Sequence, residues 1–376
     1  MEFRKMENIG AEVSLLGFGC MRYPTDEQGN IDREQAFAMI DEAYRNGVNY
    51  FDTAYPYHGG TSEGVTGEAL NRYPRESYYL ATKLPVWSVK TLEDAKNIFA
   101  DQLSRLQKDF VDFYLMHALN KDRWETVKEL KILDYFKELK EQGKIRYLGF
   151  SFHDGYNVFE EILSSYPWDF CQIQFNYMDR DTQATDKGIA LAESLGIPVV
   201  VMEPVKGGSL ANLPEDITKI FRESRPKDTA SSWALRYVGT FSNVKVILSG
   251  MSDLSQVKDN LKTFGTFEPL SEEEKGVVDR VAGALHARVQ NGCTACRYCM
   301  PCPAGVDIPG SFKIWNTYHV YNNVKDTLQR WNGELRAEAK PVNCVECGKC
   351  EAACPQKIQI RKDLKRVQKE MDALDQ

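Results

Sequence analysis

The chain has 376 residues, of which 43% are hydrophobic and 27% are charged, and its formal net charge is -7. These proportions are ordinary for a globular protein, and the negative charge excludes the basic surface that nucleic-acid binding normally needs. No apolar run is long enough to span a bilayer, and the charged segment Met1–Asn8 lacks the apolar core of a secretion signal. We therefore expect a cytoplasmic protein with no nucleic-acid or membrane partner.

Short apolar runs alternate with longer amphipathic ones along most of the chain, a rhythm that predicts repeated βα units. Eight such units favour a closed (β/α)8 TIM barrel over an open doubly wound sheet, which usually carries a glycine fingerprint after its first strand. The segment Gly17-Phe18-Gly19-Cys20 lacks that fingerprint. The expected strands are residues 13–19, 50–54, 78–84, 112–119, 145–152, 170–176, 198–205 and 244–250.

Four ionisable side chains come at or just after the ends of expected strands, where TIM barrels carry their chemistry. Asp52 ends the second strand and Tyr57 follows it, while Lys83 and His117 end the third and fourth. Each residue alone has a structural interpretation: Tyr57 as a packing tyrosine, Lys83 with Asp52 as an ion pair, and His117 as a core histidine. Four such residues in order favour a catalytic site.

The segments Phe51-Asp52-Thr53-Ala54-Tyr55-Pro56-Tyr57, Thr82-Lys83 and Leu115-Met116-His117 resemble the catalytic tetrad of the aldo-keto reductases. The resemblance implies that Tyr57 is the general acid that protonates a carbonyl as hydride arrives from a nicotinamide. It implies that Lys83, paired with Asp52, lowers the pKa of that tyrosine, and that His117 orients the carbonyl.

The same resemblance implies a set of nicotinamide contacts. They are Ser151 and Gln172 for the carboxamide, Met202 where many members have a stacking aromatic residue, and Asn260 for the adenine. Phe152 replaces the family's asparagine, and Gly250 and Gln256 replace the basic residues that bind the 2'-phosphate of NADPH. Without a guanidinium there, a preference for NADPH is weakened, so NADH, NADPH and a flavin such as FMN stay open as cofactors.

A helix is expected at residues 271–287, because Ser271-x-x-Glu274 has the spacing of a capping box. We place the domain boundary at its end. The chain is then a barrel domain of residues 1–287 followed by a small, α-rich, ferredoxin-like dicluster domain of residues 288–376.

Two cysteine runs lie in that small domain, Cys293-x-x-Cys296-x-x-Cys299-x-x-Cys302-Pro303 and Cys344-x-x-Cys347-x-x-Cys350-x-x-x-Cys354-Pro355. Thiolates at this spacing, closed by Cys-Pro, are typical of [4Fe-4S] binding, and the second run has the bacterial ferredoxin spacing. In two-cluster ferredoxins the fourth cysteine of each run binds the other cluster. That rule predicts one cluster on Cys293, Cys296, Cys299 and Cys354, and another on Cys344, Cys347, Cys350 and Cys302.

Zinc and disulfides are the alternatives for these cysteines. Structural zinc usually shows two C-x-x-C pairs, whereas each run here has a third and a fourth cysteine. Disulfides would need an oxidising compartment, and no export signal is present.

These features predict an oxidoreductase that acts on a small molecule, with a carbonyl or a related organic group as substrate and two [4Fe-4S] clusters as an electron relay. A hydride carries two electrons whereas a cluster passes one, so a relay needs a centre that splits the pair, and FMN would suit that role. The alternatives are an electron-transfer protein that exchanges electrons with a ferredoxin or another redox protein, and a reductase whose clusters are only structural.

Overall fold

The computed structural model describes residues 1–375 and divides into two compact units. The first comprises Met1–Leu210 and Ser231–Lys275, and the second comprises Ala211–Ala230 and the chain from Gly276 onward. None of the described helices is both long and apolar enough to cross a membrane. The predicted domain boundary at residue 287 stays a prediction, although helix α11 (Glu272–His286) ends just before it.

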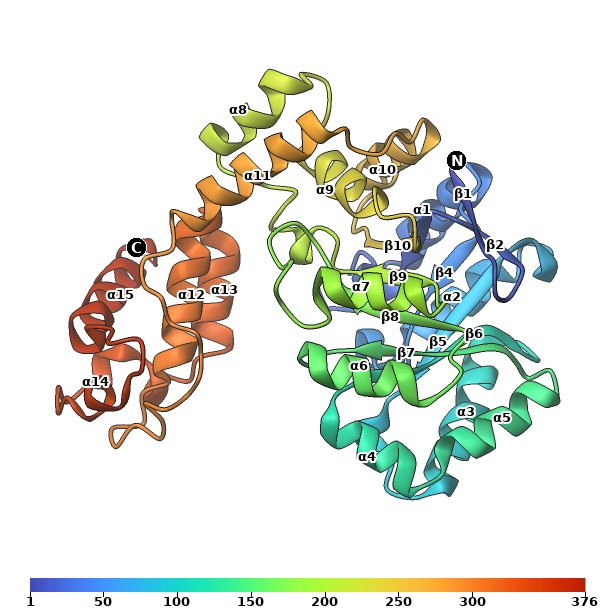
Figure 1. Cartoon of the computed structure of the whole chain (residues 1–376), viewed down its shortest axis with the longest axis horizontal. Coiled ribbons are helices and arrows are strands. Elements are labelled where there is room, and N and C mark those ends of the chain that lie inside the picture. The colour runs from blue at the N-terminus through green and yellow to red at the C-terminus, as the bar shows by residue number, and fades with distance from the viewer. Residues whose placement is uncertain (376) are drawn as a thin grey trace. The chain divides into compact units, whose positions relative to one another are not determined.

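Eight parallel strands of the first unit close into a barrel, which confirms the predicted fold (Figure 1). They are hydrogen-bonded in the order β10-β3-β4-β5-β6-β7-β8-β9. The strands are β3 (Leu16–Gly19), β4 (Tyr50–Asp52), β5 (Tyr79–Leu84), β6 (Val111–Leu119), β7 (Ile145–Phe152), β8 (Phe170–Gln174), β9 (Val199–Met202) and β10 (Val244–Gly250).

Five of the expected strands are shorter than the sequence predicts, and two of them, 13–19 and 198–205, lose three or more residues. The run 13–19 is divided, because the Ser14 hydroxyl donates to the Leu16 carbonyl at 2.7 Å and separates β2 (Ala11–Ser14) from β3. The run 198–205 ends at Met202, because Glu203 takes a left-handed backbone conformation with φ 57°. A left-handed residue cannot continue a strand, so the chain turns into a loop at the mouth of the barrel.

A hairpin of β1 (Phe3–Met6) and β2 covers the N-terminal end of the barrel. The Arg4 guanidinium donates to the carbonyls of Gly239, Phe241 and Val244, which lead into β10. Met6 is fully buried in the same apolar cluster as strand residues such as Phe113. With this end closed, the opposite end is left for ligands.

Several barrel helices begin at polar residues that cap their free N–H groups. Asp32 caps α1, Asp253 caps α10, and Thr91 with Asp94 forms a capping box at α3. The helices are α1 (Arg33–Arg45), α2 (Ser62–Leu70), α3 (Leu92–Leu106), α4 (Lys121–Glu129), α5 (Ile132–Glu141), α6 (Tyr156–Ser165), α7 (Thr185–Ser194), α9 (Ala230–Gly239) and α10 (Leu254–Gly265). The predicted capping box of α11 is also present, with Ser271 and Glu274 hydrogen-bonded in both directions.

The second unit is helical and has its own apolar core. Its other helices are α8 (Glu215–Ser224), α12 (Ile308–Tyr321), α13 (Val324–Gly333), α14 (Lys349–Ala353) and α15 (Ile360–Leu374). Trp315 of α12, Trp331 of α13 and Leu364 of α15 are almost fully buried in one cluster. Six of the predicted cluster cysteines pack against that core: Cys293, Cys299, Cys302, Cys344, Cys350 and Cys354.

Candidate active site and cysteine centres

The barrel brings the four predicted catalytic residues to its C-terminal end. Asp52 is the last residue of β4, Lys83 lies one residue before the end of β5, and His117 lies near the end of β6. Tyr57 opens a short 3-10 turn after β4, residues Tyr57–Gly60. Because β4, β5 and β6 are neighbours in the barrel, residues that are far apart in sequence meet at one place.

Lys83 and Asp52 form a buried ion pair at the centre of this group. The Lys83 Nζ lies 2.5 Å from Asp52 Oδ1 and 2.7 Å from the Thr53 carbonyl oxygen, and both side chains are almost completely buried. Burial disfavours the ammonium, but the Asp52 carboxylate, with a contribution from Tyr57 when that tyrosine ionises, outweighs burial and raises the pKa of Lys83. Lys83 is therefore a cation at neutral pH.

Tyr57 lies against both Lys83 and His117. The Lys83 Nζ is 5.2 Å from the centre of the tyrosine ring, and the His117 ring is 5.9 Å away and nearly perpendicular. Burial raises the pKa of Tyr57, and the Lys83 cation offsets only part of that rise. The influence of Lys83 on the tyrosine pKa has the predicted sign, but burial outweighs it. The tyrosine thus keeps its proton at neutral pH.

His117 is held in its neutral form. Burial, followed by the Lys83 charge, lowers its pKa well below the usual value. Its Nδ1 atom is buried and has no hydrogen-bond partner among the described residues. The Trp87 ring lies 5.0 Å from the imidazole and is half exposed, so an aromatic side chain that the sequence left unassigned borders the site.

A buried polar network behind Lys83 was missed in the sequence. Gln102 of α3 donates to the Lys83 carbonyl at 3.0 Å, to Glu63 at 2.9 Å and to Thr82 at 3.0 Å, while Tyr114 donates to Gln102 at 2.6 Å. A signal was available, because Gln102 continues the buried stripe of α3 that includes Ala95, Phe99 and Leu106. A polar residue at such a position needs a buried partner.

Three of the predicted nicotinamide contacts lie on neighbouring strands. Ser151 on β7 is paired with Gln172 on β8, and the Gln172 Nε2 is 3.5 Å from the Met202 sulfur on β9. The Gln172 Oε1 is buried without a partner among the described residues. An orphaned amide oxygen can accept from a carboxamide N–H, so these residues fit a nicotinamide ring.

The remaining positions differ in their surroundings. Asn260 on α10 donates to the Ser249 hydroxyl of β10 at 2.9 Å, and β10 is the strand beside β9. Phe152, which replaces an asparagine of the family pattern, is buried and packs on Phe159 at 5.2 Å. Position 152 therefore contributes to the core and offers no polar contact.

In the second unit, two cavities are lined by cysteines from both runs. One cavity, of about 210 Å³, is lined by Cys344, Cys347 and Cys350 of the second run and by Cys299 and Cys302 of the first run. The other is lined by Cys293, Cys296, Cys299 and Cys354. All eight thiols of the runs are free, and within residues 1–375 no three His, Cys, Asp or Glu side chains converge on the position of a single metal ion. A [4Fe-4S] cube does not need such convergence, because each thiolate binds a different iron at a corner of the cube. Cavities lined by several thiolates suit an iron-sulfur cluster.

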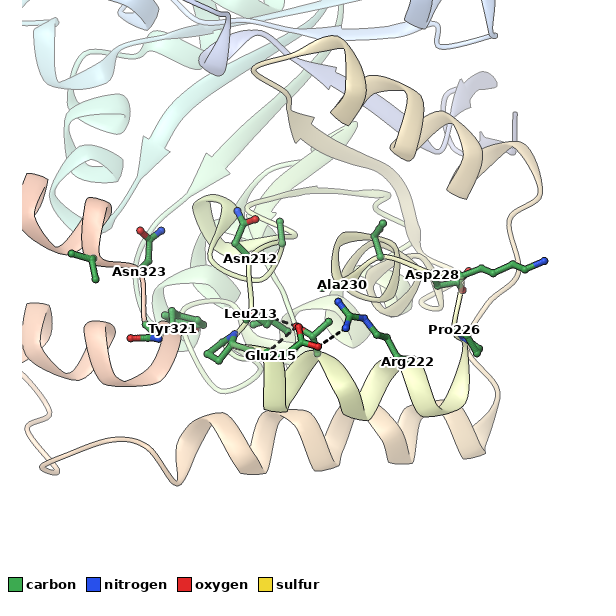
Figure 2. Close-up of a pocket in the computed structure, with 16 residues that line it drawn as sticks. Asn212, Leu213, Glu215, Arg222, Pro226, Asp228, Ala230, Tyr321 and Asn323 are labelled. Atoms are coloured by element: carbon green, nitrogen blue, oxygen red, sulfur yellow. Dashed lines mark hydrogen bonds and ion pairs between the residues drawn. The ribbon is translucent and has the colours of Figure 1, made fainter.

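A larger open cavity of about 990 Å³ also lies within the second unit (Figure 2). It is lined by α8, by the segments on either side of that helix and by the turn between α12 and α13. Glu215 and Arg222 form an ion pair of 2.5 Å on its wall. None of the site residues predicted from the sequence lines it.

The sequence matches the Aldo/keto reductase family over residues 15–282. The protein belongs to the aldo/keto reductase family. Residues 292–358 match the 4Fe-4S dicluster domain, so this aldo/keto reductase also carries an iron-sulfur domain. The predicted family and the predicted class of oxidoreductase are both confirmed.

Relatives of the protein match its barrel. An L-galactose dehydrogenase of Arabidopsis thaliana is 26% identical over 73% of this chain and 92% of its own length. An NADH-specific methylglyoxal reductase of Escherichia coli is 27% identical over 68% of this chain and 90% of its own length. Among solved structures, the aldo-keto reductase AKR11C1 from Bacillus halodurans in its holo form is 31% identical, covers 75% of this chain and 96% of its own, and has a TM-score of 0.63.

Proposed function

We propose that the barrel reduces the carbonyl group, or a related unsaturated group, of a small organic molecule. The observation that carries this proposal is the buried Lys83–Asp52 ion pair with Tyr57 and His117 against it. A bound nicotinamide supplies the hydride. Tyr57 donates its proton to the carbonyl oxygen, the Lys83 cation stabilises the phenolate that remains, and the neutral His117 orients the oxygen.

A substitution at Tyr57 tests this assignment. Tyr57→Phe removes only the hydroxyl, so we expect reduction of a model carbonyl such as methylglyoxal to fall by about 10²–10⁴-fold. The affinity for the nicotinamide and the iron content should not change. Tyr55→Phe is the matched control, because the Tyr55 hydroxyl donates to Asp101 instead. Turnover retained in Tyr57→Phe would remove this residue from the mechanism.

For the cofactor we propose NADH, bound through Ser151, Gln172, Met202 and Asn260. Gln256 stands where many NADPH-dependent members have a basic residue, and its Oε1 accepts from the Ser252 N–H at 2.9 Å. That side chain thus closes a loop and offers no cation to a 2'-phosphate. The name of the NADH-specific relative from Escherichia coli agrees with this preference.

We further propose that the second unit holds two [4Fe-4S] clusters. One is bound by Cys293, Cys296, Cys299 and Cys354, and the other by Cys302, Cys344, Cys347 and Cys350. The support is that each of these sets lines one cavity. The clusters then relay single electrons, and a ferredoxin or another redox protein is the candidate partner. In each set one thiol is exposed, Cys296 and Cys347, which favours exchange at the protein surface.

An anaerobic titration of the cluster-loaded protein separates the three roles of the clusters. NADH is added first and NADPH second, while the visible absorbance of the oxidised clusters is followed. Bleaching would support the relay and would call for a centre such as FMN to split the hydride. Bleaching by a reduced ferredoxin but by neither nucleotide would favour an electron-transfer protein. If dithionite alone bleached the clusters, a structural role would be favoured. A cytoplasmic location stays a prediction.

A further inference from the structure

An arginine from the turn after β3 fills the space beside Gly250. Gly250 ends β10 and pairs with Gly19 at the end of β3, and Arg22 follows β3 in the short turn Cys20–Arg22. A Cβ on Gly250 would lie 3.0 Å from Cδ and 3.1 Å from Cγ of Arg22. The arginine stem therefore occupies the space where a side chain at position 250 would begin.

The guanidinium of Arg22 extends to the loop after β9. A Cβ on Gly207 would lie 3.3 Å from Arg22 Nη2, and Gly207 has a φ of +63° that side chains rarely adopt. Gly208 is also left-handed, with φ +95°, and has no atom within 4 Å of where its Cβ would be. Two glycines in these conformations leave the backbone open to a ligand beside a planar cation.

The Arg22 guanidinium has N–H groups that are free to bind a ligand. Its nearest carboxylate is Glu203, at 3.9 Å, and the arginine side chain is 44% exposed. No hydrogen bond of the Arg22 guanidinium is present among the described residues. The nearby Lys206 is different, because its Nζ lies 2.6 Å from both oxygens of Asp179. Of these two described cations, Arg22 thus has free N–H groups and Lys206 is already paired.

We propose that Arg22, whose stem lies in the space that a side chain at position 250 would need, binds the diphosphate of the nicotinamide dinucleotide. The inference rests on the proposed function. Met202 ends β9 and Asn260 lies on the helix after β10, so a cofactor that touches both must cross between these two strands. The diphosphate joins the two halves of such a cofactor, and Arg22 contacts the loops at both strand ends. A guanidinium matches phosphate oxygens in pairs.

This assignment predicts that NADH and NADPH depend on the same arginine. NADH and NADPH have the same diphosphate, so both should depend on Arg22 equally. Glu203 competes for the same guanidinium and repels phosphate, so its removal should strengthen binding.

The test is the affinity of the anaerobic, cluster-loaded protein for NADH, NADPH and reduced nicotinamide mononucleotide, measured by isothermal titration calorimetry. Arg22→Gln keeps part of the stem over Gly250 and loses the charge. We expect it to weaken both dinucleotides about tenfold and to leave the mononucleotide, which has no diphosphate, unchanged. Glu203→Gln should tighten both dinucleotides by about two- to fivefold. Arg33→Ala, at an exposed arginine paired with Glu68, is the control and should change nothing.

Three results would overturn the inference. Unchanged dinucleotide affinity in Arg22→Gln would remove Arg22 from the site, while the proposed reductase would stand. A loss confined to NADPH would assign the arginine to the 2'-phosphate. A wild-type protein that bound neither dinucleotide would end the nicotinamide part of the proposed function, and this inference with it. Circular dichroism of each variant verifies that the fold is retained.

Discussion

The two candidate sites of this protein are assembled in opposite ways. In the barrel, Asp52, Lys83 and His117 come from three separate strands, and the ladder of the sheet holds their geometry without any ligand. In the second unit, the thiols come from two short runs in mostly irregular segments, and they line cavities against a small helical core. The barrel site is therefore preorganised, whereas we expect the cysteine centres to need their metal for rigidity.

The largest effect should follow from removal of a cluster thiol. Cys347→Ala is expected to lose about half of the iron and acid-labile sulfide, because only one of two clusters loses a ligand. The second unit should also become sensitive to proteolysis, since metal binding contributes to folding. Cys171→Ala is the matched control, because Cys171 is buried in β8 of the barrel. Unchanged iron in Cys347→Ala would contradict the ligand assignment.

A smaller effect, confined to the barrel, should follow from Lys83→Met. This change leaves the Asp52 carboxylate buried and unpaired, which should cost about 3–5 kcal/mol of unfolding free energy. Carbonyl reduction should fall by at least ~10²-fold. In the double variant Asp52→Asn/Lys83→Met most of the stability should return, since neither charge is left, while the activity stays low. Denaturant unfolding and turnover measure the two quantities, and a double variant as unstable as Lys83→Met would refute the pairing argument.

The smallest expected effect concerns the pH dependence of the barrel. Burial holds the pKa of His117 well below its usual value, so below about pH 6.5 the unfolded chain takes up a proton that the folded protein does not. Stability should therefore fall as the pH falls, by about 1.4 kcal/mol per pH unit from this residue, until the folded-state pKa is reached. His117→Gln should flatten that slope in urea unfolding from pH 7 to pH 5. Equal slopes in both proteins would show that the histidine is not held neutral.

The fold could be read from the sequence because each strand is a compact apolar run with a helix after it. The candidate tetrad could be identified from the sequence because residue type and chain order are enough to recognise it: Asp52, Tyr57, Lys83 and His117. Gln102 and Arg22 could not be placed in the same way. Gln102 matters because it hydrogen-bonds the Lys83 carbonyl and the Glu63 carboxylate. Arg22 matters because its stem fills the space over Gly250. Neither relation is visible until the strands are side by side.

The ends of elements were also hard to predict. The strand expected at 198–205 stops at Met202 because of one left-handed residue, Glu203, and backbone handedness at a non-glycine leaves little trace in sequence. The pKa of Tyr57 was also hard to predict, because two opposing effects act on it. The sequence supplies the cation that lowers it, but the extent of burial that raises it depends on the finished site.

One consequence of the barrel site is optical. Of the six tryptophans, Trp124, Trp168, Trp233, Trp315 and Trp331 are almost fully buried, whereas the Trp87 side chain is 47% exposed and lies 5.0 Å from His117. A water-exposed indole emits at longer wavelength and is quenched by small solutes that cannot reach buried rings. The red edge of the protein's fluorescence therefore reports on this residue, and a molecule that enters the site beside His117 should shield it from acrylamide. Without any label, the protein carries its own indicator of occupancy.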